Sequence, residues 1–285
     1  MATTRASWSR TTSRPLLRPR VRWFRLRSRR PSRCSTAPSD ALLAAGHYDV
    51  RNLPEALLGT EGQLRVWRAV QSGRAELLPG ARKALSALPY PRYYLDFETI
   101  NFAVPRFAGT RPYQQIPFQW SLHVEGPDGS LSHQEFLDLS GEHPARAVAN
   151  ALLEAVGSSG PVLMYTSFER TCINNLAEFC PALRTRLMAL AERLVDLHPI
   201  VKENYYHPDM HGSWSIKAVL PTIAPELDYS NLGDIQEGTA VQQAYVEAIS
   251  SDTLDSRKQE IRESLLRYCK HDTLAMVTLA RHLAK

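Results

Sequence analysis

Several features that would assign a common enzyme class are missing from this chain of 285 residues. It has no Walker-type phosphate loop, no G-x-G-x-x-G dinucleotide fingerprint and no G-x-S-x-G nucleophile elbow. It also lacks a run of about 18 apolar residues, so we expect no membrane-spanning helix. The chemistry must therefore come from a less common arrangement of residues.

Cysteine is scarce, and none of the four cysteines forms a C-x-x-C pair. A zinc knuckle or a thioredoxin-like motif is therefore not expected. The spacing of Cys172 and Cys180 suggests two thiols on or near one helix. We expect them to be buried, reduced and structural, as in a cytosolic protein.

Acidic residues are absent before Asp40, whereas eleven arginines lie between Arg5 and Arg33. Without these eleven, 23 basic residues face 29 acidic ones, so the net charge of +5 comes from the N-terminal segment. The remainder is mildly acidic, which does not support a general basic surface for nucleic acid, although a local basic groove stays open.

The arginine-rich segment, residues 1–40, is also rich in Ser, Thr and Pro and has no apolar periodicity, so we predict a disordered leader. The same composition is typical of a mitochondrial transit peptide, and residues 21–26 could bind an anionic surface. Translation from an over-extended start is a third explanation. The composition does not decide among them, and we expect a cytoplasmic, bacterial protein with mitochondrial targeting kept open.

Residues 41–90 predict a short helical adaptor, and residues 91–285 a mixed α/β domain with antiparallel hairpins first and a helical crossover after. We expect a five-stranded sheet flanked by helices, with one strand not placed. The predicted strands are 93–97, 118–124, 131–137 and 162–165, with a turn at 126–129; the predicted helices are 63–70, 81–88, 145–156, 168–179 and 182–194.

Two carboxylates on the first predicted strand are the most informative feature. Successive side chains of a strand point to opposite faces, so Asp96 and Glu98 share one face. Two acids side by side on an apolar strand repel each other and resist desolvation, and a divalent cation would relieve both costs. The pair is therefore a candidate metal site, although D-x-E alone is common.

Further acids follow at positions that could complete such a site. Glu169 lies in the first turn of a helix that follows a strand, where the helix dipole alone would also favour an acid. Tyr268 and Asp272 are four residues apart and share one helix face. There a carboxylate could hold a metal while the phenol positions a water. Asp196 is a fifth acid, which could simply cap a helix.

In this order, the acid pair, the strand-to-helix acid and Tyr-x-x-x-Asp resemble the tyrosine-type branch of the DnaQ-like DEDD 3′–5′ exonucleases, in the ribonuclease-H-like superfamily. The resemblance covers about residues 92–285. It implies two Mg²⁺ or Mn²⁺ ions held by Asp96, Glu98, Glu169 and Asp272, with Tyr268 orienting the water. The chain departs from the family pattern at two positions. It has Glu169 where the family usually has Asp, and Thr166 near the position where the family often has Asn.

The segments 111–121, 207–217, 219–221 and 272–276 look like the bacterial domain-of-unknown-function family 2779. That resemblance implies the same ribonuclease-H-like fold and makes Glu169 a variant that the family uses. Longer relatives carry an upstream nuclease-like, cysteine-bearing region, so the chain looks like a C-terminal piece. An upstream nuclease domain or partner is therefore expected.

The function expected from these resemblances is metal-dependent 3′–5′ exonuclease action on DNA or RNA 3′ ends, a hydrolase activity on phosphodiester bonds. Thr99, Phe168 and Lys217 are candidate substrate contacts. The alternatives are a non-catalytic nucleic-acid-binding or interaction module of the same fold, and a different ribonuclease-H-like enzyme such as an endonuclease.

Three aromatic residues and two histidines are weaker candidates. Phe118, Trp120 and Trp214 could stack on bases, but a buried core role is favoured. His207 and His211 could bind zinc on a helix, but Pro208 favours a loop that is structural or contacts substrate.

Overall fold

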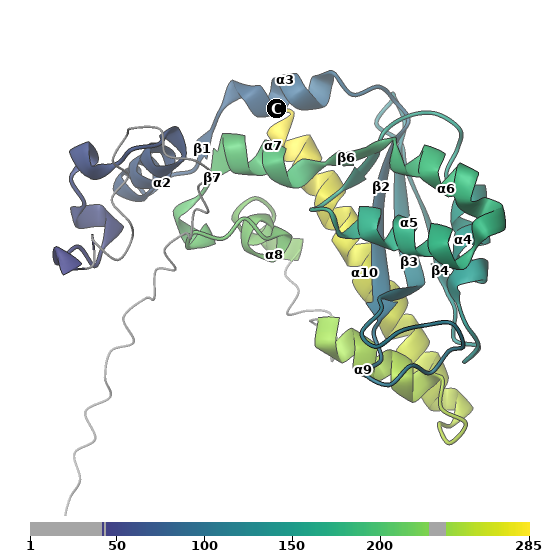
Figure 1. The fold of residues 1–285 in the computed structure, drawn as a ribbon. Helices are drawn as coiled ribbons and strands as arrows, with labels where there is room; N and C mark the ends of the chain where they lie inside the picture. The colour runs from purple at the N-terminus through teal and green to yellow at the C-terminus, as the bar shows by residue number, and fades with distance from the viewer. Residues whose placement is uncertain (1–41, 43, 228–237) are drawn as a thin grey trace, which may run out of the picture.

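The computed structural model describes residue 42, residues 44–227 and residues 238–285 (Figure 1). The predicted leader, residues 1–40, lies outside them. The helices are α2 (Glu61–Ser72), α3 (Pro79–Ser86), α4 (Ala145–Ala155), α5 (Phe168–Phe179), α6 (Arg184–Ala191), α7 (Leu197–Asn204), α8 (Ile216–Val219), α9 (Gly238–Ala248) and α10 (Asp255–Leu283). The strands are β1 (Glu76–Leu77), β2 (Arg92–Ile100), β3 (Ile116–Glu125), β4 (Leu131–Leu137), β5 (Val162–Met164), β6 (Leu194–Asp196) and β7 (Tyr205–Tyr206).

A five-stranded mixed sheet lies at the centre, in the order β4-β3-β2-β5-β6, and confirms the predicted α/β architecture. β2, β3 and β4 pair antiparallel, whereas β5 and β6 run parallel to β2. The predicted turn after β3 is present, with Gly129 at a φ of 80° and the amide of Gly126 bonded to the carbonyl of Ser130. Hairpins therefore form one half of the sheet and helical crossovers the other.

The fifth strand, which the sequence left unplaced, is β6, and it takes the end of an expected helix. The helix expected over 182–194 is shorter, and Leu194–Asp196 pairs with β5 instead. Three residues carry too weak a pattern to identify a strand, and the pairing with β5 decides their conformation. Asp196 ends this strand and caps α7 by accepting a hydrogen bond from the amide of His198 at 2.9 Å, so the expected capping role is confirmed.

The two faces of the sheet are covered by different helices (Figure 1). Tyr93, Leu95 and Phe97 of β2 pack in one core with side chains of α4, α5 and α6. The alternate residues of β2 face the other side, where Tyr94 packs with α10. Asp96 and Glu98 belong to this second set because of the two-residue period of a strand. The α10 side therefore carries the acids.

The aromatic candidates for base stacking are core residues. Phe118 is fully buried, and its ring stacks on that of Tyr245 at 3.9 Å. Trp120 and Trp214 are also buried, and their indole N–H groups donate to the carbonyls of Val148 and Tyr205. The stacking alternative is therefore wrong for these three residues, and the favoured core role is confirmed.

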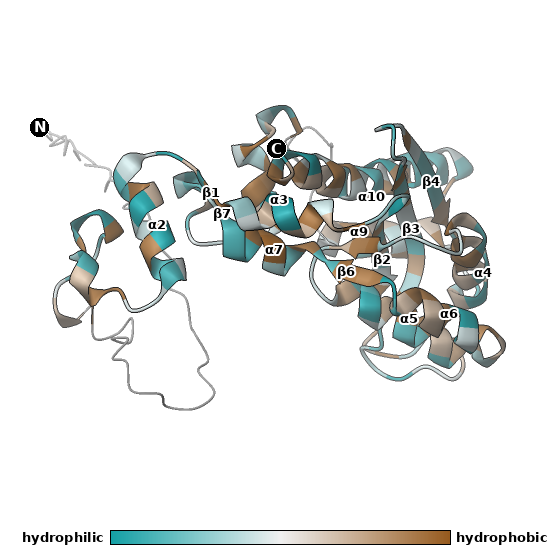
Figure 2. Cartoon of the chain, turned by 90° about the horizontal axis from the view of Figure 1, so that it is seen from above, coloured by the Kyte–Doolittle hydropathy of each residue, from teal (hydrophilic) through white to brown (hydrophobic). Residues whose placement is uncertain are grey.

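The segment before the sheet forms a small lobe around α2 that lies apart from the sheet in Figure 2. The segment also docks on the sheet domain, because β1 pairs with β7 and α3 packs against α7. Ala81 and Leu85 of α3 are fully buried in a core shared with α10. Within the described residues, no helix has both the length and the apolar character needed to cross a bilayer.

The connection from α4 to β5 passes very close to the start of β2. Gly160 adopts a φ of 90°, and a Cβ atom there would collide with the carbonyl oxygen of Pro91. The guanidinium of Arg193 donates to the carbonyls of Gly157, Ser159 and Gly160 and so holds this turn. Only glycine satisfies both the conformation and the contact at position 160.

Candidate metal centre

Asp96 and Glu98 lie at the carboxyl-terminal half of β2, on the face covered by α10. Both are half-buried. The register between β2 and β3 shifts directly after Glu98, so an irregularity interrupts the pairing just beyond the second acid before it resumes at Thr99. Such irregularities re-aim side chains and are frequent beside active sites.

Glu169 reaches the same place from the end of β5. Its first-turn position on α5 is the one expected from the sequence. Thr166, between β5 and α5, has a φ of 77°, a left-handed conformation that is strained for a β-branched residue. The Thr166 amide donates to Asp196 at 2.9 Å, which holds this turn and sets the direction in which α5 starts. The side chain of Glu169 is 2% exposed and exchanges a hydrogen bond with Asp96.

Helix α10 supplies the third group. Tyr268 and Asp272 lie one turn apart and face the sheet, as their spacing predicted. The ammonium of Lys217, on the short helix α8, donates to the Tyr268 hydroxyl at 2.9 Å and lies 5.2 Å from the centre of its ring. A cation and a phenol from separate elements therefore meet beside the acids.

These elements enclose a cavity of about 140 Å³. Asp96 from β2, Glu169 from α5 and Asp272 from α10 all line it, so three acids far apart in the sequence converge. Glu98 flanks them on β2. The lining residues are Asp96, Tyr165, Glu169, Ile216, Lys217, Asp272 and Met276.

The acids are held at a high electrostatic cost. Burial, and then the charge of Asp272, raise the pKa of Asp96 to about 8. Burial, and then the charge of Asp96, raise the pKa of both Glu98 and Glu169 well above the ordinary value for a glutamate. Burial raises the pKa of Tyr268, with Asp272 and the other acids adding to the effect. Without a cation, this cluster therefore retains protons near neutral pH.

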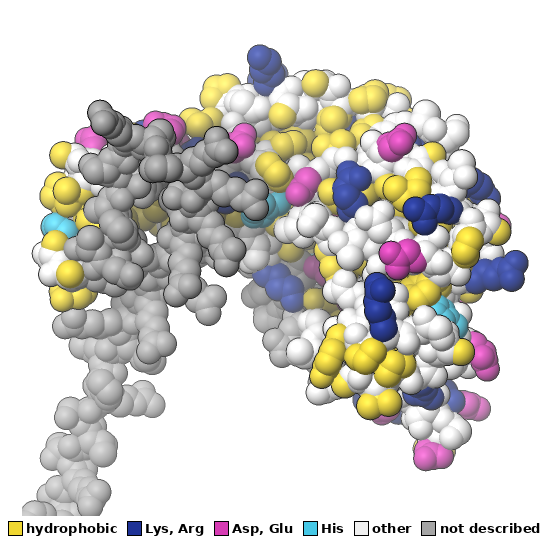
Figure 3. All heavy atoms as spheres, in the orientation of Figure 1, with side chains coloured by type: hydrophobic (Ala, Val, Ile, Leu, Met, Phe, Trp, Pro, Cys, Tyr) yellow, Lys and Arg dark blue, Asp and Glu magenta, His cyan; other side chains and the backbone are white. Residues whose placement is uncertain are grey.

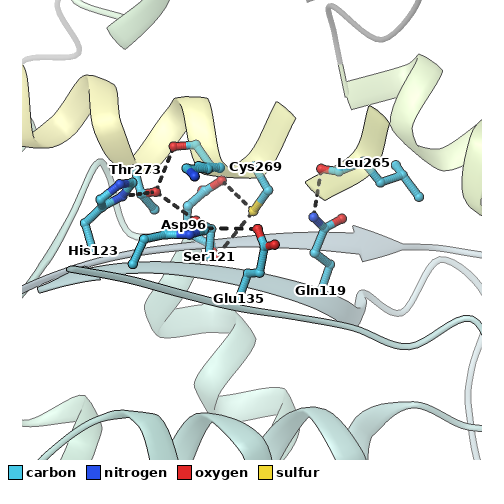
Figure 4. Close-up of polar contacts among 10 residues, drawn as sticks. Asp96, Gln119, Ser121, His123, Glu135, Leu265, Cys269 and Thr273 are labelled. Carbon is cyan, nitrogen blue, oxygen red and sulfur yellow. Dashed lines mark hydrogen bonds and ion pairs between the residues drawn. The ribbon is translucent and has the colours of Figure 1, made fainter. Parts of the chain in front are cut away.

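Cys269 is a site residue that the sequence analysis missed. Its buried Sγ lies 3.5 Å from Oδ2 of Asp96, and one ligand atom each from Asp96, Glu98 and Cys269 lie within 4.8 Å of one another. Figure 4 shows the thiol on α10 directed at Asp96 on the sheet. The available signal was position, since Cys269 precedes Asp272 by three residues and so shares its helix face.

Two of the predicted substrate contacts lie elsewhere. Thr99 is buried beyond the register shift, and Phe168 packs against the core on the opposite side of the sheet. Neither is among the residues that line the cavity, in the part of the chain that the structure describes. Lys217 is the predicted contact that does line it.

The histidine pair forms no helical metal motif. His207 caps a short turn, with its Nδ1 accepting from the amide of Asp209, and His211 ends that turn at a φ of 48°. The loop expected there is confirmed. The two thiols expected to be buried, Cys172 and Cys180, are buried and free.

The outer surface carries mixed charge. Figure 3 shows basic side chains interspersed with acidic ones over the α4, α5 and α6 side, without a continuous basic band among the coloured residues of that view. This distribution agrees with the mildly acidic composition of the body. On this face, a contact with a polyanion would therefore be local.

The curated relatives are distant and longer than this chain. "Uncharacterized protein UU173" of Ureaplasma parvum is 21% identical over 276 residues, covering 87% of this chain and 40% of that protein. "Uncharacterized protein MG366 homolog" of Mycoplasma pneumoniae is 26% identical over 210 residues, covering 66% of this chain and 31% of that protein. The chain spans less than half of the length of these relatives. No solved structure matches it. Residues 93–215 match the family described as "Domain of unknown function (DUF2779)", which confirms that part of the resemblance expected from the sequence.

Proposed function

We propose that the chain is a metal-dependent 3′–5′ exonuclease with a ribonuclease-H-like fold, acting on phosphodiester bonds of DNA or RNA. The observation that carries the proposal is the convergence of Asp96, Glu169 and Asp272 from three separate elements on one cavity, with Glu98 beside Asp96 on β2. Acids this close together repel one another and lose hydration on burial, and packing alone does not explain that cost.

The donor set fits hard divalent cations. Four carboxylates offer oxygen ligands, which suit Mg²⁺ or Mn²⁺ rather than zinc. One oxygen of Glu169, Oε2, is buried without a hydrogen-bond partner. A cation would satisfy this oxygen and offset the repulsion that raises the pKa of Asp96 and of both glutamates.

Asp96, Glu98, Glu169 and Asp272 would hold two such ions. When bound, the ions would activate a water and stabilise the charge that develops on the phosphate oxygens. Tyr268 keeps its proton because its pKa is raised, so its hydroxyl is a neutral group that can orient a water. Lys217 donates to that hydroxyl and lines the cavity, so its positive charge would favour a substrate phosphate bound there.

The sheet supports the fold part of the proposal. Three antiparallel strands followed by two that run parallel to the first, with helices on both faces, is the arrangement that the resemblance to ribonuclease-H-like proteins implies. Since fold alone does not assign function, the argument depends on the acids rather than on the sheet.

The deciding experiment is a digestion of labelled single-stranded and duplex DNA and RNA with Mg²⁺, Mn²⁺ or EDTA. We expect 5′-labelled substrate to shorten one nucleotide at a time, only with metal. The matched variants are Asp96→Asn and Asp272→Asn, which keep side-chain size. We expect either to slow digestion by at least about 100-fold, an effect comparable to the loss of one electrostatic group at an active site.

Other results would select the alternatives. Binding of nucleic acid without digestion by the wild type would support a non-catalytic module. Internal cuts in place of a one-nucleotide ladder would support an endonuclease. Digestion that persists in the Asp96→Asn, Asp272→Asn double variant would exclude the acids as the catalytic groups.

A further inference from the structure

Strand β3 carries a row of buried polar side chains directly beside the acids. Gln119, Ser121 and His123 alternate along the strand and are at most 3% exposed. Ser121 pairs with Asp96 and Gln119 with Glu98 in the β2–β3 register. Burying a row of polar side chains beside charged groups costs free energy unless each side chain has a hydrogen-bond partner. The partners of this row therefore indicate its role. We call these three residues the polar stripe.

Two members of the polar stripe, Ser121 and His123, bond to the same residue of α10, Thr273. The Thr273 hydroxyl lies 2.8 Å from Oγ of Ser121 and 2.8 Å from Nδ1 of His123, and it donates to the carbonyl of Lys270 at 3.0 Å (Figure 4). Because a carbonyl only accepts, Thr273 has no second proton to give. Ser121 and His123 are then the donors to Thr273, and His133 of β4 donates to Ser121 at 2.9 Å.

This directed chain of hydrogen bonds agrees with the environment of the two histidines. Burial lowers the pKa of His123 and of His133 to about 4, so both rings are neutral at pH 7. A neutral imidazole ring carries one N–H group. One N–H is what each histidine needs here, because His123 donates to Thr273 and His133 donates to Ser121. Every hydroxyl between the sheet and this part of α10 therefore has a partner.

A further hydrogen bond joins the polar stripe to α10 about two helical turns before Thr273. The side-chain amide of Gln119 donates to the carbonyl of Leu265 at 2.8 Å, and both groups are buried. Tyr268 and Asp272 lie between this hydrogen bond and those at Thr273. Apolar packing could be satisfied after a small rotation or shift of a helix, but these directional bonds could not.

We propose that the polar stripe and Thr273 are positioning residues that fix the register of α10 and so aim Asp272 and Tyr268 at Asp96 and Glu98. The proposal rests on the proposed function for its catalytic consequence, but the placement of Asp272 can be measured without it. These residues differ from the proposed metal ligands because they act through α10 and are not among the described residues that line the cavity.

The test compares Thr273→Val, which keeps the shape and removes the hydroxyl, with Thr273→Ser, which keeps the hydroxyl. Thr278→Val is the matched control, because the Thr278 hydroxyl also lies on α10 but bonds only to the Leu274 carbonyl of its own helix. Ser121→Ala is the second variant if Thr273→Val does not fold. Melting temperature, Mn²⁺ affinity by calorimetry, and kcat and KM for digestion are measured for each.

We expect Thr273→Val and Ser121→Ala to weaken Mn²⁺ binding about 10- to 100-fold, as loss of outer-shell partners does at metal sites. Thr273→Ser should stay within about threefold of the wild type, and Thr278→Val should bind Mn²⁺ like the wild type. In digestion, kcat should fall while KM holds, since positioning acts on the reacting groups. Equal Mn²⁺ affinity in Thr273→Val and Thr278→Val would overturn the proposal.

The two proposals fail separately. If the wild type binds Mn²⁺ but digests no substrate, the proposed exonuclease activity is refuted. The Mn²⁺ affinities of Thr273→Val and Thr278→Val then still decide the positioning role. If the wild type binds no Mn²⁺, crystal structures of the wild type and Thr273→Val decide it. The proposal then requires the Asp272 carboxylate of the variant to leave the cavity, and an unchanged position refutes it.

Discussion

The protonation of the acid cluster makes the stability of the metal-free protein fall as the pH rises. Asp96 has a pKa raised from 3.8 to about 8 in the folded chain. In the unfolded chain it ionises near its ordinary value. Between these two pH values the folded chain holds one proton that the unfolded chain has lost, so each increase in pH favours unfolding.

The size of the effect follows from this single proton. One group contributes a slope of about 1.4 kcal/mol per pH unit while it stays protonated in the folded state only. The slope decreases as the pH approaches the folded pKa. Between about pH 6.5 and pH 8 the loss is therefore on the order of 1 to 2 kcal/mol. Glu98 and Glu169, whose pKa values are also raised, act in the same direction.

The choice of pH window reduces a competing contribution from histidines. Burial lowers the pKa of His123 and of His133 to about 4, so these groups stabilise the fold progressively as the pH rises, and most of this gain is complete by about pH 6.5. The remaining gain is common to the wild type and to Asp96→Asn. Asp96→Asn isolates the acid, because it removes the titrating group at nearly the same size. We expect this variant to lose less stability than the wild type across the window.

Urea unfolding in EDTA at about pH 6.5, 7, 7.5 and 8 measures this difference. With Mn²⁺ added, the stability of the wild type should depend less on pH, because a bound cation favours the ionised acids. Mn²⁺ should also stabilise Asp96→Asn much less than it stabilises the wild type. Identical pH slopes for the wild type and Asp96→Asn in EDTA would refute the raised pKa. Equal stabilisation of both proteins by Mn²⁺ would refute the assignment of Asp96 as a ligand.

Three further predictions concern single positions. Glu169→Asp should weaken Mn²⁺ binding about tenfold by calorimetry, because the shorter side chain withdraws from Asp96, and unchanged affinity would show that the reach of Glu169 is not used. Lys217→Met should lower kcat for digestion about 10- to 100-fold, through loss of the contact to Tyr268, with a much smaller change in melting temperature; a loss of stability alone would assign it to packing. Gly160→Ala should destabilise the fold by more than about 2 kcal/mol in urea unfolding, because its Cβ meets the carbonyl of Pro91 at a positive φ, and a near-neutral result would mean that the turn adapts.

The parts predicted well from the sequence were those with strong local patterns. The β4 strand and the α5 helix have the predicted bounds, because each shows a clear periodicity between turn residues. Asp96 and Glu98 were recognisable because two acids on an apolar strand conflict with burial. Their convergence with Asp272 could not be derived from local pattern alone; the order of the acids indicated it only through resemblance.

The parts that were missed depend on contacts between distant segments. β6 exists because β5 lies beside it, and β1 exists because β7 does. Thr99 and Phe168 were predicted as site residues because they adjoin the acids in sequence. However, Thr99 lies beyond the register shift, and Phe168 packs against the core on the other face of the sheet. Cys269 and the polar stripe were overlooked because a buried hydroxyl, amide or thiol reveals its use only with its partner.

The cavity draws its acids from an early strand, a central helix and a late helix. A fragment that lacks β2, α5 or α10 would keep only some of the carboxylates and would not bind a cation at this site. If the proposed site is correct, catalysis requires β2, α5 and α10 to have folded together. Once loaded, the ions would cross-link distant stretches and make the chain come apart as one unit.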